Sequence, residues 1–220
     1  LLENASATQA QAVGQALLQA MAREFDIGND RLEISASIGI VTYPADGESA
    51  SLLMRYVDLA LHRAKSSGRN CLTVFSRDLS DELQRRVLLE ARLKQALARE
   101  EFMLHYQPKL EIRSGRLIGW EALLRWHSPE LGAVSPDEFI PVAEQSGLIL
   151  PIGNWVLREA CRQMRAWRDM GLAAGSMAVN LSTRQFRQKD LAEAIGVALS
   201  DTGLAPDALE LEITESSIMD

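Results

Sequence analysis

The sequence predicts an α/β fold in two parts, and three observations lead to this prediction. Apolar segments with the period of a strand alternate along the chain with longer segments that have the period of a helix. Gly and Pro residues separate most of these segments. From residue 117 onward the order is strand, helices, strand, helix, strand, which is typical of parallel strands covered by helices. At 220 residues the chain can hold two small domains or one large one.

The first part of the chain predicts a small helix–strand–helix–strand unit. Its elements are a helix over Ala7–Phe25, a strand over Leu32–Tyr43, a helix over Ser51–Ser67 and a strand over Cys71–Phe75. The first helix is rich in Ala, Gln and Leu, and Ser6 or Thr8 can cap it. The second helix has one apolar face and closes at Gly68.

The second part predicts about half of an α/β barrel, since a complete barrel takes roughly 250 residues. Its elements are a helix over Asp78–Arg99, strands over Phe102–Ile112 and Leu117–Trp126, helices over Pro136–Gly147 and Pro151–Met170, a strand over Met177–Ser182, a helix over Arg187–Thr202 and a strand over Leu209–Glu215. Residues 113–116 have hairpin length, and Pro136 suits the first turn of a helix. With the boundary near Ser76–Asp78, the two domains are 1–77 and 78–220.

The segment Trp120–Trp126 carries charges inside an apolar strand, where a charge is costly to bury without a partner. Alternation places Glu121, Leu123 and Arg125 on one face and the two tryptophans, with Ala122 and Leu124, on the other. One face therefore combines a carboxylate with a guanidinium, a pairing that suits a metal ligand beside a phosphate contact.

Two later strands also carry polar side chains. Asn180 lies inside Met177–Ser182, although Asn is disfavoured in strands. Leu209–Glu215 alternates strictly, so that Glu210 and Glu212 share a face. Active residues of α/β barrels lie at the carboxyl ends of parallel strands. Hard oxygen donors that converge from several strands are the ligands that Mg²⁺ and Mn²⁺ prefer, so a divalent-cation site is predicted.

Composition limits the kinds of molecule that the protein can bind and indicates its cellular compartment. The net charge of −7 argues against broad nucleic-acid binding, which needs a basic surface. A dianionic ligand would have to be attracted locally, by a metal and an arginine. The longest mainly apolar stretch, 147–157, is too short to cross a membrane. Cys71 and Cys161 fall in different predicted domains, so we expect reduced thiols and a cytoplasmic location. Any membrane anchor of the protein would come from segments outside this sequence.

Five ordered sequence blocks resemble the EAL domains, the bacterial cyclic-di-GMP phosphodiesterases. The blocks are Tyr106-Gln107-Pro108, Glu121-Ala122-Leu123 within Gly119–Trp126, Phe139–Glu144, Val179-Asn180-Leu181-Ser182 and Glu210–Glu215. Ahead of them, Ser37–Ile40 and Asp58–Asn70 resemble the C-terminal portion of a GGDEF domain, of the diguanylate cyclase type. The resemblance implies a cyclase-like α/β part followed by the first half of an EAL-type barrel.

The resemblance implies roles for individual residues. Glu121, Asn180 and Glu212 match the family's ligands for Mg²⁺ or Mn²⁺, and Glu121 and Glu215 match residues needed for catalysis. Gln107 and Arg125 match positions that contact the cyclic-di-GMP substrate, and guanidinium pairs well with phosphate. The implied reaction is metal-dependent hydrolysis of cyclic-di-GMP to linear pGpG. Family enzymes often dimerise through the barrel, so a homodimer is an expectation by analogy.

Simpler readings of these residues stay open. Glu121 could be a structural partner of Arg125, and Asn180 could close a loop through its amide. Glu210 could be solvated or salt-bridged, and Gln107 could be an ordinary residue at the end of a strand. Lys65 and Arg69 match phosphate contacts of cyclases but can equally be solvated surface cations.

Two other functions remain open as well. The EAL part could be a receptor that binds cyclic-di-GMP without cleaving it, or a regulatory module of a diguanylate cyclase. The retention of Glu121, Arg125, Asn180 and Glu212 favours the enzyme. The family's second metal depends on an Asp-Asp pair, followed by a lysine and a glutamate, beyond the fourth strand. A polypeptide limited to residues 1–220 is therefore expected to show no turnover.

Overall fold

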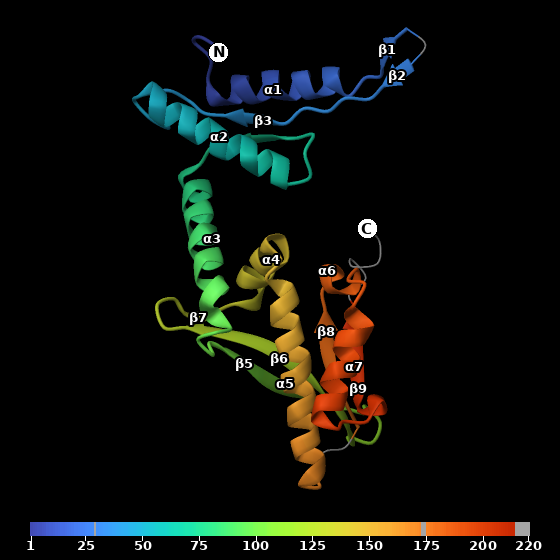
Figure 1. Cartoon of the computed structure of the whole chain (residues 1–220). Coiled ribbons are helices and arrows are strands. Elements are labelled where there is room, and N and C mark those ends of the chain that lie inside the picture. Colours follow the sequence, from blue (N-terminus) through green and yellow to red (C-terminus); the bar gives the residue numbers. More distant parts are fainter. Residues whose placement is uncertain (29, 173–174, 214–220) are drawn as a thin grey trace. The chain divides into compact units, whose positions relative to one another are not determined.

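The computed structural model describes residues 1–28, 30–172 and 175–213. Its internal contacts divide the chain into two units, Leu1–Arg85 and Arg86–Asp220 (Figure 1). The domain boundary near Ser76–Asp78 stays a prediction. Within the described residues, no helix is both long enough and apolar enough to cross a membrane.

The first unit combines two helices with a short parallel strand pair and a hairpin. Its elements are α1 (Ala7–Met21), β1 (Phe25–Ile27), β2 (Asp30–Leu32), β3 (Ile38–Ile40), α2 (Ala50–Ser66) and β4 (Leu72–Val74). Ser6 caps α1 together with Gln9, since each side chain accepts a hydrogen bond from the other residue's backbone. β3 and β4 pair in parallel, and α1 and α2 pack against them.

The predicted strand Leu32–Tyr43 is wrong in extent. Leu32 ends the antiparallel hairpin of β1 and β2, and only Ile38–Ile40 pairs with β4. A strand exists only where a partner supplies backbone hydrogen bonds, and β4 is three residues long. The first helix also ends earlier than predicted, at Met21, because Phe25 belongs to the hairpin.

The second unit is an open, mixed sheet covered by helices. Its elements are α3 (Arg77–Ala96), which begins in the first unit, β5 (Phe102–Leu110), β6 (Leu117–Ser128), β7 (Gly132–Val134), α4 (Pro136–Ser146), α5 (Ile149–Asp169), β8 (Ser176–Leu181), α6 (Thr183–Phe186), α7 (Leu191–Thr202), η1 (Pro206–Ala208) and β9 (Leu209–Ile213). The strand order is β5-β6-β8-β9, with β7 paired to β6. β5 is antiparallel to β6, whereas β6, β8 and β9 are parallel, which confirms the predicted α/β class. The strand β7 and the short helix α6 are not among the elements predicted from the sequence.

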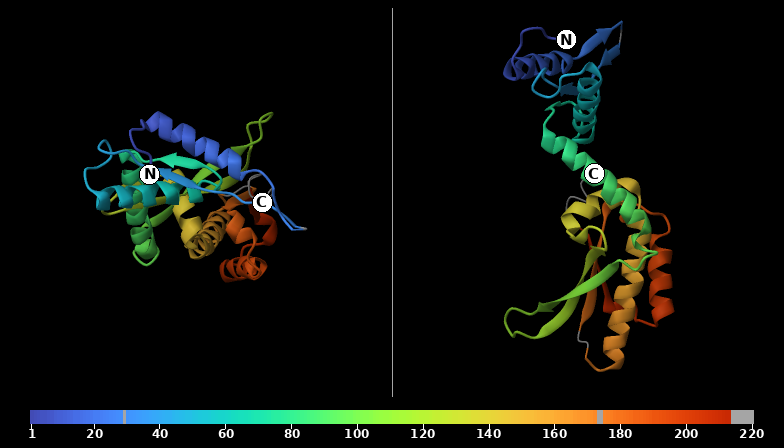
Figure 2. Two further views of the ribbon diagram at one scale, coloured as in Figure 1. Left: turned by 90° about the horizontal axis from the view of Figure 1, so that it is seen from above. Right: turned by 90° about the vertical axis from the view of Figure 1, so that its left-hand side faces the viewer.

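Helices cover one face of this sheet. α5 and α7 pack side by side, and α5 packs on β8 (Figures 1 and 2). The covered face is apolar and includes Ala122 and Trp126 of β6 and Met177, Val179 and Leu181 of β8, all buried. The polar side chains of the same strands therefore gather on the opposite face, which is the face that concerns function.

Candidate functional site

The two faces of β6 differ as the sequence predicts. Ala122 and Trp126 are buried in the core, and Trp120 and Leu124 pack against it. Glu121 and Arg125 point to the opposite face and are half-buried. Trp126 is fixed in turn by its indole Nε1, which donates a hydrogen bond of 2.9 Å to Glu101 Oε2. The apolar face thus anchors the strand and leaves the charged face free for chemistry.

Glu121 and Asn180 meet across neighbouring strands. Glu121 aligns with Ala178 of β8, so Asn180 lies one same-face step further along that strand. The Asn180 amide donates from Nδ2 to Glu121 Oε1 at 2.8 Å. Two residues that are 59 positions apart in sequence are therefore brought into direct contact on the polar face of the sheet.

Glu212 lies on the next strand, in register with Asn180. Its Oε1 accepts a hydrogen bond of 2.8 Å from Lys109 Nζ, and Glu210 Oε2 accepts a second of 3.1 Å from the same ammonium. The bond to Glu212 is the main reason that the pKa of Lys109 is raised above its usual value. Glu210 is thus salt-bridged, one of the two readings that the sequence leaves open for it.

Gln107 and Arg125 occupy the same polar face. Gln107 of β5 aligns with Glu121, so the two side chains stand directly across from one another. Arg125 lies four residues beyond Glu121, about 13 Å along the strand. Its Nη1 donates to the backbone oxygen of Leu124 at 2.8 Å, and within the described residues it forms no ion pair with Glu121. Most donors of the Arg125 guanidinium have no partner among the residues that the structure describes.

Three further predicted residues lie elsewhere. Glu215, predicted to take part in catalysis, falls outside the described residues. Lys65 and Arg69 are in the first unit, both exposed, near the C-terminal end of α2.

A short helix fixes the end of β8 where Asn180 lies. Ser182 caps α6 through a reciprocal pair of bonds with Gln185, and Gln185 is buried. Gly153 of α5 makes room for this amide, because a Cβ at Gly153 would lie 1.9 Å from Gln185 Nε2. This support was not predicted, although Ser182-x-x-Gln185 is a recognisable capping box in the sequence.

Lys109 was missed because its role depends on strand pairing. It shares a strand face with Gln107, but β5 and β9 are not neighbours in the sheet. No sequence spacing connects Lys109 with Glu210 and Glu212, which lie about a hundred residues later.

The predicted ligand set fits a small divalent cation. Within the described part of the chain, no three His, Cys, Asp or Glu side chains come together as a metal cluster. The predicted set has two carboxylates and one amide, and its members occupy neighbouring strands of one face. A half-turn of the Asn180 amide brings Oδ1, the atom that binds cations, toward Glu121. Hard oxygen donors of this kind suit Mg²⁺ or Mn²⁺.

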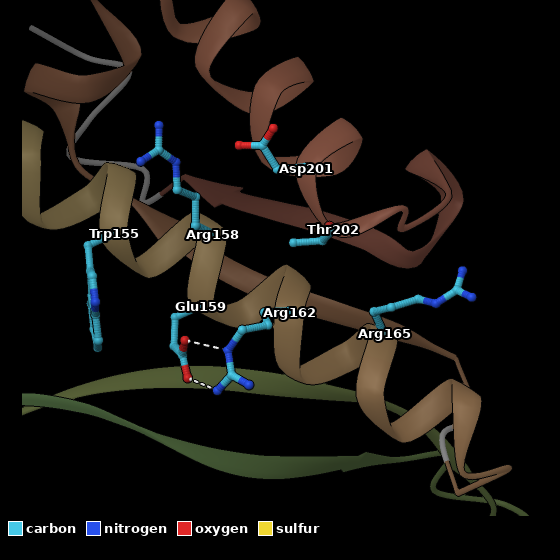
Figure 3. A pocket seen from close by; sticks show the side chains of 7 residues that line it. All are labelled: Trp155, Arg158, Glu159, Arg162, Arg165, Asp201 and Thr202. Atoms are coloured by element: carbon cyan, nitrogen blue, oxygen red, sulfur yellow. Dashed lines mark hydrogen bonds and ion pairs between the residues drawn. The ribbon is translucent and has the colours of Figure 1, made fainter.

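A surface groove of about 370 Å³ lies on the helical side of the sheet. Figure 3 shows the side chains that line it, from α5 and α7: Trp155, Arg158, Glu159, Arg162, Arg165, Asp201 and Thr202. Much of its charge is already matched, since Arg162 holds Glu159 by two bonds and Arg165 binds Asp169 and the Gly203 carbonyl. None of the predicted site residues that the structure describes lines this groove.

Comparison with known families assigns both parts of the chain. Residues 90–220 match the EAL domain, and residues 1–71 match the diguanylate cyclase GGDEF domain. The EAL match covers more than half of the chain.

Curated relatives carry both segments. The chain is 42% identical over 219 residues to the bifunctional diguanylate cyclase/cyclic di-GMP phosphodiesterase MucR of Pseudomonas aeruginosa, covering 100% of this chain and 32% of the relative. It is 34% identical over 220 residues to the cyclic di-GMP phosphodiesterase PdeR of Escherichia coli, covering 100% of this chain and 33% of the relative. The chain thus spans about a third of the length of these relatives.

Solved structures show the same fold. A structure described as the PaMucR phosphodiesterase in complex with c-di-GMP superposes with a TM-score of 0.58 at 50% identity, over 60% of this chain and 53% of that chain. The Xanthomonas citri FimX EAL domain in complex with c-diGMP gives a TM-score of 0.55 at 27% identity, over 63% and 53%. Fold and matches together define a protein of the class that joins a GGDEF segment to an EAL segment. The chain belongs to the EAL domain family and carries a GGDEF segment ahead of its EAL segment.

Proposed function

We propose that the EAL segment binds cyclic-di-GMP and hydrolyses one of its phosphodiester bonds to give linear pGpG. The observation that carries the proposal is the contact between Asn180 and Glu121, which joins two of the three proposed metal ligands on one face of the sheet. The names of the relatives MucR and PdeR support cyclic-di-GMP as the substrate, and so does its presence in the two solved structures.

In this proposal Glu121, Asn180 and Glu212 hold Mg²⁺ or Mn²⁺. When bound, the cation lowers the pKa of a water molecule and polarises a phosphoryl oxygen. Carboxylates outnumber cations among the charged strand residues of this face, which are Lys109, Glu121, Arg125, Glu210 and Glu212. A dianionic dinucleotide is therefore better accommodated together with a divalent cation than alone.

The remaining residues bind and orient the substrate. Arg125 keeps free guanidinium donors that can pair with two phosphate oxygens at once. Gln107 is exposed directly across from Glu121 and can donate or accept hydrogen bonds at the edge of a guanine base. Glu215, by resemblance, is a further residue needed for catalysis.

The test is hydrolysis of cyclic-di-GMP by the full-length gene product that carries residues 1–220, with Mg²⁺ or Mn²⁺ present. Release of pGpG, measured by chromatography, is expected. Glu121→Gln should lower its rate by more than about 100-fold, because even mutation of a residue that only supports a metal ligand lowers activity about 10- to 100-fold. Glu193→Gln, an exposed glutamate on α7, is the matched control and should keep full activity. Binding of cyclic-di-GMP with no pGpG release would refute hydrolysis and favour the receptor function.

A further inference from the structure

An ionic network of four residues lies on the polar face beside the proposed metal ligands. Lys109 Nζ of β5 is 2.8 Å from Glu212 Oε1 and 3.1 Å from Glu210 Oε2, both on β9. Ser176 of β8 donates its hydroxyl to Glu210 Oε2 at 3.2 Å. Neither Lys109 nor Ser176 has a role in the proposed function.

This network crosses two intervening strands. In the order β5-β6-β8-β9, a flat sheet would hold β5 and β9 about 14 Å apart. Lys109 aligns with Gly119 of β6, and Gly119 aligns in turn with Ser176 of β8, so neither position carries a large side chain that obstructs the lysine. The strands between are lined by small residues where the lysine passes, and the sheet curves enough for its ammonium to reach β9.

Lys109 engages only one side of Glu212. It arrives from the side of Glu210, which precedes Glu212 by two residues on the same strand face. Asn180, the register partner of Glu212, is bonded instead to Glu121. Among the described residues, Glu212 Oε2 has no hydrogen-bond partner. One carboxylate oxygen is therefore held, and the other is available to a ligand.

We propose that Lys109 is a positioning residue that makes Glu212 a single-oxygen ligand and so selects a small divalent cation over Ca²⁺. With Oε1 bound to the ammonium, only Oε2 can reach a cation beside Asn180. Mg²⁺ and Mn²⁺ suit such compact oxygen coordination, whereas Ca²⁺ gains from a carboxylate that binds through both oxygens. Glu210 and Ser176 hold the ammonium in place. This inference rests on the proposed function, because it takes Glu212 as a metal ligand.

The test separates geometry from charge by measuring two cations of the same charge. Removal of the lysine charge strengthens Mn²⁺ and Ca²⁺ binding alike, so their affinity ratio reports on coordination geometry. Mn²⁺ binding to the full-length gene product is followed by the electron paramagnetic resonance signal of the free ion, and Ca²⁺ binding by competition. Lys109→Met should reduce the preference for Mn²⁺ over Ca²⁺ by about tenfold, the scale of residues that orient metal ligands.

Two further variants keep the test decisive. Glu210→Gln should shift the ratio in the same direction by a smaller factor, and it decides the matter if Lys109→Met does not fold. Lys94→Met, which breaks a Lys94–Glu90 pair on α3, should leave the ratio unchanged. Binding of Mn²⁺ with an unchanged ratio in Lys109→Met and Glu210→Gln overturns this inference alone. Absence of Mn²⁺ binding by the wild type overturns both this inference and the proposed metal site.

Discussion

The close approach of β6 and β8 gives a sharp prediction, because it fixes the register that brings Asn180 to Glu121. Gly175 stands immediately before β8 with φ +80°, and a Cβ there would lie 1.6 Å from the backbone oxygen of Ile118. Gly171 has a similar φ of +68°, but no atom of the described residues would lie within 4 Å of a Cβ there. The pair Gly175→Ala and Gly171→Ala therefore separates steric clash from backbone strain.

The magnitudes follow from these contacts. An L-residue in the left-handed region costs roughly 1–2 kcal/mol, so Gly171→Ala should lower the free energy of unfolding by about 1 kcal/mol. Gly175→Ala carries the same strain and must also move β8 from the rigid backbone of β6. Relief of the clash separates the first register pair of these strands, Gly119 with Ser176. Loss of about two hydrogen bonds there adds roughly 2 kcal/mol, for a total of about 3 kcal/mol.

Denaturant unfolding followed by tryptophan fluorescence measures the difference. All four tryptophans, Trp120, Trp126, Trp155 and Trp167, belong to the second unit, so the signal reports on that unit. Gly175→Ala should lower the unfolding midpoint more than Gly171→Ala and weaken Mn²⁺ binding, since the strand with Asn180 shifts. Equal midpoints for the two variants would refute the argument that close strand approach sets the site.

Three further expectations concern single side chains. Trp126→Phe removes the bond to the buried Glu101 carboxylate and should cost about 2 kcal/mol of unfolding free energy in denaturant titrations; a neutral effect would contradict that bond. Burial raises the pKa of the Tyr106 hydroxyl to about 12. The stability that this group contributes is therefore complete below its unfolded pKa of about 10 and is lost as the pH rises toward 12. Spectrophotometric titration of wild type and Tyr106→Phe measures this pKa, and ionisation of Tyr106 near pH 10 would contradict it. Burial likewise raises the pKa of the Cys161 thiol to about 11. A thiol reagent at pH 8 should therefore modify the half-buried Cys71 faster than the buried Cys161. Equal modification rates of the two thiols in the folded protein would count against the packing of α5.

The architecture of the second unit could largely be read from the sequence. Strict alternation in Trp120–Trp126 and Leu209–Ile213 reflects one covered and one open face, and the parallel order of β6, β8 and β9 follows from the helices between them. The strands of the first unit were harder to predict from the sequence. The apolar residues of Leu32–Tyr43 resemble a strand, but strand formation depends on the length of the partner, which no local pattern contains.

The shared strand face of the predicted ligands could be read from the sequence for the same reason, whereas their role as metal ligands stays a prediction. Glu121, Asn180 and Glu212 stand out in the sequence because Asn and Glu are depleted inside strands. In the structure, Asn180 donates a hydrogen bond directly to Glu121. Lys109 and Gln185 support that group through contacts between elements that are distant in sequence. Such supporting contacts depend on sheet curvature and helix packing, so only a three-dimensional structure reveals them.

The position of a bound Mn²⁺ ion tests the proposed site most directly. Crystals of the full-length gene product grown with Mn²⁺ should give an anomalous scattering peak about 2.0–2.3 Å from oxygen atoms of Glu121, Asn180 and Glu212. A peak bonded to other residues, with these three side chains turned away from it, would contradict the site.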